Sequence, residues 1–404
     1  MPRAGWVKAE TDQRLSDHIS IGVLTRVFPP ELVDRVVAEA GRTEQRHRLL
    51  PARVVVYYVL GLALFSQSSY EEVMRMLVEG LSWADGWAHE WNVPTKAALF
   101  KGRARLGAEP LEALFRAVAA PMATPDTKGA WYRGLRLMSL DGTCVDVADT
   151  EANDAAFGRP GSKKTDGISA YPQLRLVALA ECGTHAIIDC AIGRYATAEV
   201  KLAPEVFGSL KPGMLALGDR GLSSFALWNE AKSTGADLLW RTTRDRVLPV
   251  KKRHRDGSFT SVIYPSQAAQ RRKSSGLEVR VVEYELDDPG RGSTDTRYRL
   301  ITTIADPKRA PADELAALYS ERWEIELAFD ELKSHQRSPR AVLRSKMPDG
   351  VVQELYGHLC VHHAIRWLMH SVATEADADP DRMSFTRAIR AARRSTASHR
   401  GFSP

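Results

Sequence analysis

The stretch YSERWEIELAFDELKSHQR, residues 319–337, places four polar side chains at offsets of 0, 3, 7 and 14: Tyr319, Arg322, Glu326 and Lys333. At about 100° per residue, an α-helix gathers them within an arc of roughly 60°. Four apolar side chains share a neighbouring arc: Leu318, Ile325, Phe329 and Leu332. The helix can therefore pack on a sheet while its polar stripe points along the sheet's edge. A carboxylate beside an aromatic hydroxyl and two cations suits a metal-bound phosphodiester, which predicts part of a phosphoryl-transfer site.

Two aspartates elsewhere in the chain can complete such a site. Asp141 lies in the segment LDGT and Asp219 in the segment LGDRG, each after an apolar run that predicts a strand. Taken singly, each has an ordinary interpretation, because Asp is common in turns at strand ends. The helix alone could likewise be a surface helix with charge pairs to Lys333. Only the combination of both aspartates with Glu326 favours a catalytic site.

The hydrophobic period changes after residue 134 and predicts the fold. Segments 135–147, 171–181 and 185–195 are typical of strands, followed by a helix over 198–208, a strand over 214–219, a helix over 225–232 and a strand over 236–243. This order predicts an α/β fold with a ribonuclease-H-like (retroviral-integrase-like) catalytic core. In such a core the first and fourth strands are adjacent and parallel, so we expect Asp141 and Asp219 to lie side by side.

Three regions are expected along the chain. Residues 1–130 predict an all-α N-terminal DNA-binding domain, and residues 131–370 predict the catalytic domain, which a helix over 349–370 closes. Inside it, the basic stretch at about 241–305 predicts a β-rich insertion. Residues 371–404 predict a basic C-terminal tail.

The spacing of Tyr319, Arg322, Glu326 and Lys333, with Trp323 after the arginine, resembles the signature of DDE transposases of bacterial insertion sequences, in the insertion sequence four family. Four further segments resemble that family: ISIGVLTRVFPPELVDRV, RLLPARVVVYYVLGLALF, MSLDGTCVDVAD and LALGDRGLSS. The resemblance covers most of residues 19–370. It implies a transposase that binds the terminal inverted repeats of its element, cleaves them and joins them to target DNA.

Asp141, Asp219 and Glu326 are the expected catalytic residues and metal ligands. Three converging carboxylates repel one another unless cations neutralise them, which two Mg²⁺ ions would do; Mn²⁺ can substitute. Such a pair of ions activates the nucleophile and stabilises the leaving oxygen. Asp146 and Asp149 are nearby carboxylates, either of which could be an auxiliary ligand. Tyr319, Arg322 and Lys333 are expected to contact DNA phosphates.

Two further DNA contacts are expected. The helix over 95–106 carries Lys101, Arg103 and Arg105, which we expect to recognise the DNA end; alternatively, it is a surface helix that touches no DNA. Relatives that form a hairpin on the excised end place an aromatic platform for an extruded base shortly before the Tyr319 helix. Tyr298 occupies that point; alternatively it is a packed strand residue, and Trp323 or Trp240 takes the role.

Composition is consistent with a DNA partner without proving one. The formal net charge of +6 over 404 residues is a moderate basic excess. The four cysteines have no zinc-binding spacing and are expected to be reduced, and the longest apolar run, about 12 residues, is too short to span a bilayer. We expect a cytoplasmic bacterial protein that is nucleoid-associated when bound to DNA, and a homodimer on double-stranded DNA because two ends must be joined.

Two other functions remain open from the sequence. One is a ribonuclease-H-like endonuclease that cuts without strand transfer, although a plain nuclease needs neither the N-terminal region nor the insertion. The other is a non-catalytic DNA-binding protein descended from a transposase, which the intact set of three acids disfavours.

Overall fold

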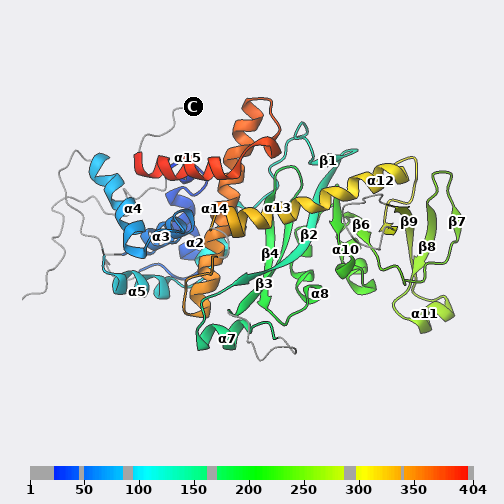
Figure 1. The fold of residues 1–404 in the computed structure, drawn as a ribbon, viewed down its shortest axis with the longest axis horizontal. Helices are drawn as coiled ribbons and strands as arrows, with labels where there is room; N and C mark the ends of the chain where they lie inside the picture. Colours follow the sequence, from blue (N-terminus) through cyan, green and yellow to red (C-terminus); the bar gives the residue numbers. More distant parts are fainter. Residues whose placement is uncertain are drawn as a thin grey trace, which may run out of the picture. The chain divides into compact units, whose positions relative to one another are not determined.

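The computed structural model describes residues 22–44, 50–84, 94–161, 171–285, 297–337 and 341–398 (Figure 1). They form two compact units that alternate along the chain. A helical unit comprises the described parts of Met1–Ala120, Val145–Pro172 and Asp330–Pro404, and a sheet unit comprises those of Pro121–Cys144 and Gln173–Phe329. These compact units are a different division of the chain from the expected regions 1–130, 131–370 and 371–404, which remain predictions.

The helical unit is organised around α14 (Pro348–Glu375), which packs against the N-terminal helices α3 (Ala52–Leu64) and α6 (Glu109–Val118). Helix α3 is buried nearly all round, which is why its sequence is apolar on every face. Helix α14 contacts these helices and belongs to the same compact unit. The remaining helical elements are η1 (Gly22–Arg26), α2 (Pro30–Glu39), α3 (Ala52–Leu64), α4 (Tyr70–Ala84), α5 (Lys96–Leu106), α6 (Glu109–Val118), α7 (Glu151–Phe157), η4 (Glu331–His335), η5 (Pro380–Arg382) and α15 (Phe385–Ser398).

Within the described residues, the sheet unit contains one mixed sheet of ten strands in the order β4-β3-β2-β5-β6-β10-β9-β8-β7, with β1 beside β2. Its elements are β1 (Trp131–Tyr132), β2 (Leu135–Asp146), β3 (Gln173–Glu181), β4 (Ala186–Arg194), α8 (Glu199–Leu202), α9 (Pro204–Phe207), β5 (Met214–Gly218), η2 (Arg220–Leu222), α10 (Phe225–Ser233), β6 (Asp237–Arg241), β7 (Lys252–Arg253), β8 (Phe259–Ile263), α11 (Gln267–Arg272), β9 (Leu277–Glu285), β10 (Arg297–Thr302), α12 (Ala312–Leu318), η3 (Tyr319–Trp323) and α13 (Glu324–Asp330). The expected insertion therefore continues the central sheet through β10 instead of forming a separate body.

The parallel strands β2, β5 and β6 are aligned so that paired residues form a row across the sheet. Leu140 of β2 pairs with Gly218 of β5, and Gly218 pairs with Trp240 of β6. The expectation that the first and fourth predicted strands are adjacent and parallel is confirmed. The residues that follow this row are Asp141, Asp219 and Arg241, so two acids and an arginine occupy corresponding positions on three neighbouring strands.

Alternating side chains bury both faces of the central strands. Ala216, Leu238 and Trp240 join one core with helices α8, α9 and α10. Leu215, Leu217 and Leu239 join a second core with α12 and Tyr319 of η3. The sheet is thus a layer between helices, an α/β arrangement (Figure 1), and Tyr319 of η3 packs in the core opposite to that of Trp240.

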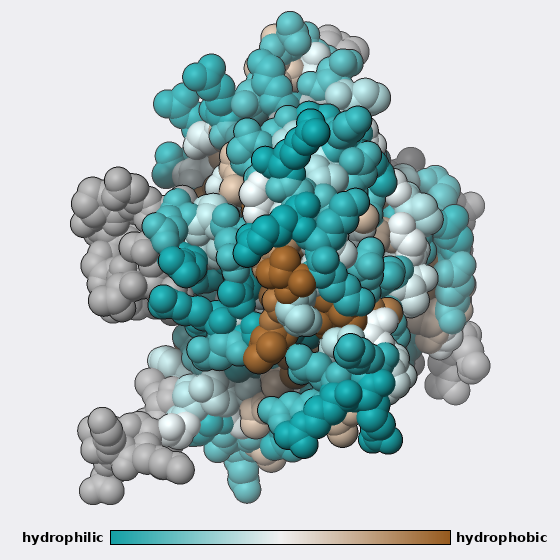
Figure 2. Space-filling view, turned by 90° about the vertical axis from the view of Figure 1, so that its right-hand side faces the viewer, coloured by the Kyte–Doolittle hydropathy of each residue, from teal (hydrophilic) through white to brown (hydrophobic). Residues whose placement is uncertain are grey.

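On the side of the molecule where β7, β8 and β9 lie, hydrophilic side chains cover most of the surface and surround a small apolar patch (Figure 2). No helix among the described residues is long and apolar enough to cross a membrane.

Candidate active site

Asp141 and Asp219 lie beside each other because their strands do. Each follows one member of the Leu140–Gly218 pair, so both side chains face away from the core that contains Leu140. The backbone N–H of Gly142 donates to Asp141 Oδ1 at 2.8 Å. That of Leu222 donates to Asp219 Oδ1 at 3.2 Å, as Asp219 caps the short helix η2. Local backbone donors thus fix both carboxylates.

The stripe predicted on one regular helix lies on a chain of helical segments. Helix α12 continues as the 3-10 segment η3, the α-helix α13 and the π-helical segment η4. Arg322 of η3 places Nη1 2.9 Å from Asp141 Oδ2 and Nη2 3.3 Å from Glu326 Oε1. The guanidinium therefore connects an acid of the sheet to the acid of the helix.

Tyr319, which we expected to contact a DNA phosphate, makes a contact within the protein. Its side chain is buried, and its hydroxyl donates to the carbonyl oxygen of Gly218 at 3.1 Å. Because Gly218 directly precedes Asp219, this bond holds η3 against the strand that carries the acid. Burial raises the pKa of the Tyr319 hydroxyl above its usual range, so the group stays protonated and remains a donor.

The site carries an excess of negative charge that favours a cation. Burial raises the pKa of Asp141 to about 6; the Gly142 N–H and Arg322 counteract this, and the carboxylates of Asp219 and Glu199 add to it. Burial lowers the pKa of Arg322, but Tyr319, Asp141, Glu326 and Asp219 outweigh it, and the pKa is raised. Arg322 is thus a cation held among carboxylates, and oxygen donors of this kind suit Mg²⁺ or Mn²⁺.

Sequence reasoning missed the fourth carboxylate, Glu199. Its side chain packs against the Cα of Gly142, where an added Cβ would lie 2.4 Å from Glu199 Cδ. Arg175 of β3 holds it through an ion pair of 2.7 Å. A glutamate at the start of a short helix carries no sequence signal for this placement; the glycine after Asp141 was the available hint, since only a residue without a side chain leaves this space.

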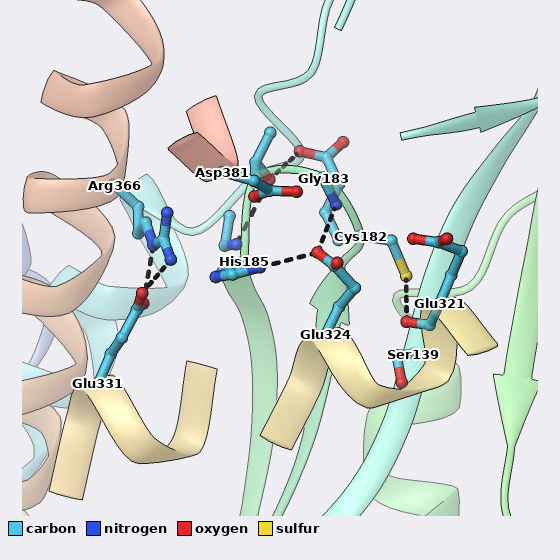
Figure 3. A network of polar contacts seen from close by, with 12 residues as sticks. Ser139, Cys182, Gly183, His185, Glu321, Glu324, Glu331, Arg366 and Asp381 are labelled. Carbon is cyan, nitrogen blue, oxygen red and sulfur yellow. Dashed lines mark hydrogen bonds and ion pairs between the residues drawn. The ribbon is translucent and has the colours of Figure 1, made fainter. Parts of the chain in front are cut away.

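Four contacts anchor the helical segments that carry Arg322 and Glu326, and Figure 3 shows those made by Glu321 and Glu324. Glu324 accepts a hydrogen bond of 3.1 Å from the Gly183 N–H, and its Oε2 lies 2.8 Å from Nε2 of His185. Ser139 Oγ donates to the carbonyl oxygen of Arg322 at 2.9 Å. Cys182 Sγ lies 3.7 Å from the carbonyl oxygen of Glu321. The turn after β3 thus fixes the helix relative to the sheet.

Some of the predicted site residues belong to the helical unit. Lys333 lies in η4 and belongs to the helical unit. In the same unit, Asp149 is paired with Arg159 at 2.7 Å. The sheet unit contains Asp141, Asp219, Tyr298, Tyr319, Arg322 and Glu326.

Tyr298 is a strand residue with aromatic and cationic neighbours. It pairs with Tyr284 across β9 and β10, and the two rings stack with centroids 5.3 Å apart. The guanidinium carbon of Arg241 lies 4.0 Å from the centre of the Tyr298 ring. The ring is half-buried, so part of its surface remains accessible.

The three residues expected to recognise DNA differ in exposure. Arg103 is buried and donates to Gln353 Oε1 at 2.8 Å and Ser345 Oγ at 2.9 Å, so the structure contradicts its expected contact with DNA: its hydrogen bonds hold α5 to α14. Arg105 is half-buried and donates to the Leu50 carbonyl at 2.7 Å. Lys101 is exposed on α5 and is the member of the set that solvent reaches freely.

Comparison with known proteins gives two family matches that follow one another along the chain. Residues 18–116 match the family described as insertion element 4 transposase N-terminal, and residues 132–363 match the transposase DDE domain. The second match alone spans more than half of the chain and contains Asp141, Asp219 and Glu326.

Two relatives come from Escherichia coli (strain K12). Transposase InsG for insertion sequence element IS4 is 29% identical over 377 residues, which cover 93% of this chain and 83% of that protein. Putative transposase InsZ is 27% identical over 57% of this chain and 74% of its own length. Among solved structures, a piggyBac transposase synaptic complex with hairpin DNA matches at 11% identity and a TM-score of 0.47, over 93% of this chain and 80% of that one. At that TM-score the likeness bears on neither mechanism nor partners.

Proposed function

The chain belongs to the transposases that join an insertion element 4 N-terminal region to a DDE domain, and on this premise we propose that it binds the terminal inverted repeats of an insertion sequence, cleaves the ends and joins them to target DNA. We further propose that it acts in the bacterial cytoplasm, where its DNA lies.

One observation carries the proposal. Asp141 and Asp219 follow a registered pair on adjacent parallel strands, and Arg322 connects Asp141 to Glu326. Two carboxylates thus contact one cation, and the third, Asp219, follows the strand next to that of Asp141. Such an assembly suits metal-assisted phosphodiester chemistry and has no evident structural purpose.

A DDE domain implies a divalent metal, and we propose that Asp141, Asp219 and Glu326 hold two Mg²⁺ ions. When bound, the ions would activate the attacking oxygen and stabilise the leaving one. The protein's residues would fix the geometry: Tyr319 holds η3 against β5, and the Gly142 and Leu222 N–H groups orient the aspartates. Arg322, and Lys333 from the helical unit, would contact phosphates of the bound end.

Both proposed DNA steps are attacks of an oxygen nucleophile on a phosphodiester. Water would first nick the element's end, and the freed 3′-hydroxyl would then attack another phosphodiester. We propose that this second step passes through a hairpin, with Tyr298 supporting an extruded base, before insertion. Because two ends must be joined, we propose a homodimer on DNA.

The test is a cleavage and strand-transfer assay with purified protein and a duplex that ends in the element's inverted repeat. Such repeats should flank the gene. Mg²⁺-dependent nicking followed by covalent joining to a target plasmid is expected. Nicking without joined products would favour a plain endonuclease, and binding without either reaction would indicate a non-catalytic DNA-binding protein.

A further inference from the structure

A buried ion pair lies at the start of the helical segments that carry Arg322 and Glu326. Arg280 of β9 is fully buried, and its Nη2 lies 2.6 Å from Oδ2 of Asp256, a residue of the turn between β7 and β8. Burial raises the pKa of Asp256, but hydrogen bonds from Ser258 and the charge of Arg280 outweigh this effect and lower the pKa. Asp256 is therefore an ionised acid beside a buried cation.

Each nitrogen and oxygen of these two side chains makes a hydrogen bond. Arg280 donates from Nε to Ser258 Oγ at 2.8 Å and from Nη1 to the carbonyl oxygen of Ala310 at 2.6 Å. Asp256 Oδ2 also accepts from the backbone N–H of Ala312 at 3.1 Å, and Oδ1 accepts from the N–H and the hydroxyl of Ser258. Ala312 is the first residue of α12. The ion pair thus ties the turn after β7 to the start of that helix.

Arg280 faces the same side of the sheet as the predicted catalytic acids. Alternate residues of a strand face opposite sides. Leu137 and Val282 both join the core that contains α12. Arg280, two residues before Val282, and Asp141, four residues after Leu137, therefore face that side as well. The ion pair and the acids thus lie on the face that the helical segments cover.

The helical segments cross this face from β9 toward β2 (Figure 1). Helix α12 contacts β9, and η3 contacts β5. Three strand intervals separate β9 from β5, or about 15 Å at about 5 Å each. The chain from Ala312 to Arg322 rises by about the same distance, at about 1.5 Å per residue. Fixing Ala312 at β9 therefore sets where Arg322 lies along the face.

A second contact at the start of α12 is exposed to solvent. Glu314 accepts from the Tyr132 hydroxyl at 2.8 Å and pairs with Arg133 at 2.6 Å, where both charged side chains are exposed. Exposed ion pairs contribute little to stability. A buried pair costs desolvation, and apolar residues of similar volume often stabilise a fold as well or better. The burial of Arg280 with Asp256 thus favours a role in geometry over one in stability alone.

We propose that Asp256 and Arg280 are positioning residues for DNA cleavage: they fix the start of α12 and, through it, the placement of Arg322 and Glu326 beside Asp141. The inference rests on the proposed function. It gives the segment from β7 to β9 a task that is separate from any contact with DNA.

The experiment compares three variants. Asp256→Asn removes the charge that faces Arg280 at nearly constant shape. Glu285→Gln is the matched control, because it makes the same kind of change in an exposed ion pair of β9. The double variant Asp256→Ala with Arg280→Met removes both buried charges.

Four quantities are measured for each variant. They are the free energy of unfolding in urea, the affinity for a duplex that ends in the inverted repeat, the single-turnover rate of Mg²⁺-dependent cleavage, and the amide hydrogen exchange of residues 312–326. The exchange is measured on metal-free protein without DNA, so it reports on the helical segments independently of activity.

Asp256→Asn should cleave about 10- to 100-fold more slowly than Glu285→Gln, because a displacement of about 1 Å can cost this much. Its affinity for the end should stay within about 2-fold of the control, since both variants remove one negative charge. Hydrogen exchange across residues 312–326 should speed up about 5-fold. The double variant should regain most of the stability that Asp256→Asn loses, because no buried charge is left unpaired, and should still cleave slowly.

The proposal is overturned if Asp256→Asn matches Glu285→Gln in cleavage or in hydrogen exchange. It is also overturned if the double variant recovers cleavage together with stability, which would show that the pair only stabilises the fold. A parallel fall of affinity and cleavage would overturn it in favour of a DNA contact. Wild-type protein that cleaves no end would instead count against the proposed function, while hydrogen exchange would still decide whether the ion pair fixes the helix.

Discussion

The guanidinium of Arg322 lies 2.9 Å from Asp141 Oδ2, so the cation expected to meet DNA is also the partner of a predicted metal ligand. Arg322 offsets the charge of the acids, and under the proposed function it would also donate hydrogen bonds to a phosphate.

Replacing Arg322 with Ala should weaken binding of the cleaved end and slow cleavage, because one change removes both tasks. Lys333→Ala should mainly weaken binding. The slope of log affinity against log salt should become shallower by about one for each variant. Gel-shift titrations across salt concentrations check this; an unchanged slope together with unchanged cleavage would assign these cations to the protein surface.

Asp219→Asn and Glu326→Gln should abolish Mg²⁺-dependent cleavage while end binding stays within a few-fold of wild type. The reason is that both substitutions preserve shape and remove a charged oxygen ligand. Single-turnover cleavage with a labelled end measures the loss. A variant that cleaves at nearly the wild-type rate would remove its residue from the metal site.

Asp141 should make the stability of the metal-free protein depend on pH. Its pKa is about 6 in the folded protein against an ordinary value of 3.8, so between these values the folded state binds more protons than the unfolded state. The free energy of unfolding therefore falls as pH rises through this window, by at most about 3 kcal/mol. Asp141→Asn should be more stable than wild type at pH 7.5 and nearly equal at pH 4, measured by urea unfolding with a chelator present.

Repeating the unfolding measurement with added Mg²⁺ is the control for the role of Asp141. It should stabilise the wild type at pH 7.5 by offsetting the buried charge, and stabilise Asp141→Asn much less. An Asn variant that is less stable than wild type at pH 7.5 would mean that the pair with Arg322 outweighs the cost of burial.

Lys101 and Arg103 should behave differently although they lie on one helix. Lys101→Ala should reduce affinity for the end sequence without changing stability, because the side chain is exposed. Arg103→Ala should cost about 2–4 kcal/mol of unfolding free energy, because Gln353 and Ser345 lose a buried partner. Chemical denaturation and end-binding titrations separate the two effects; equal affinity of Lys101→Ala and wild type would place recognition elsewhere.

Tyr298→Ala should leave the first nick nearly intact and selectively slow hairpin formation, since an extruded base would lose a stacking platform of about 1–3 kcal/mol. An abasic site at the extruded position should partly rescue the variant. Gel analysis of nicked and hairpin products checks the prediction. If both steps slow together, or neither does, Tyr298 serves the stacked pair with Tyr284, and the platform must be another aromatic.

The central strands could be predicted from sequence because their signals are local. Apolar runs set β2 and β5, and the rules for parallel crossovers placed the two strands side by side, which fixed the relation of Asp141 to Asp219. Arg322 and Glu326 were predicted on one regular α-helix and lie instead on a 3-10 segment and the α-helix after it. They still face the same side, since four residues span about one turn in either kind of helix.

Other features could not be predicted because they depend on distant partners. Charge predicts that Arg103 is exposed, yet Gln353 and Ser345, some 240 to 250 positions away, supply the hydrogen bonds that let it be buried. The long helix α14 has apolar residues on most faces, and such a pattern does not say which unit will cover it. The anchoring of Glu324 by Gly183 and His185 depends on a turn whose position no local pattern reveals.

The alternation of the two units along the chain limits how this protein can be divided. The chain passes from one unit to the other between Cys144 and Val145, and again between Phe329 and Asp330. Each passage comes three residues after a predicted catalytic acid, Asp141 in the first case and Glu326 in the second. A gene chimera that exchanges the helical unit with that of a relative must therefore make several junctions, two of them within one helical turn or a few strand residues of the acids. If the helical unit recognises the DNA end, as predicted for Lys101, point substitutions on its helices will therefore change end specificity more readily than exchange of a contiguous block.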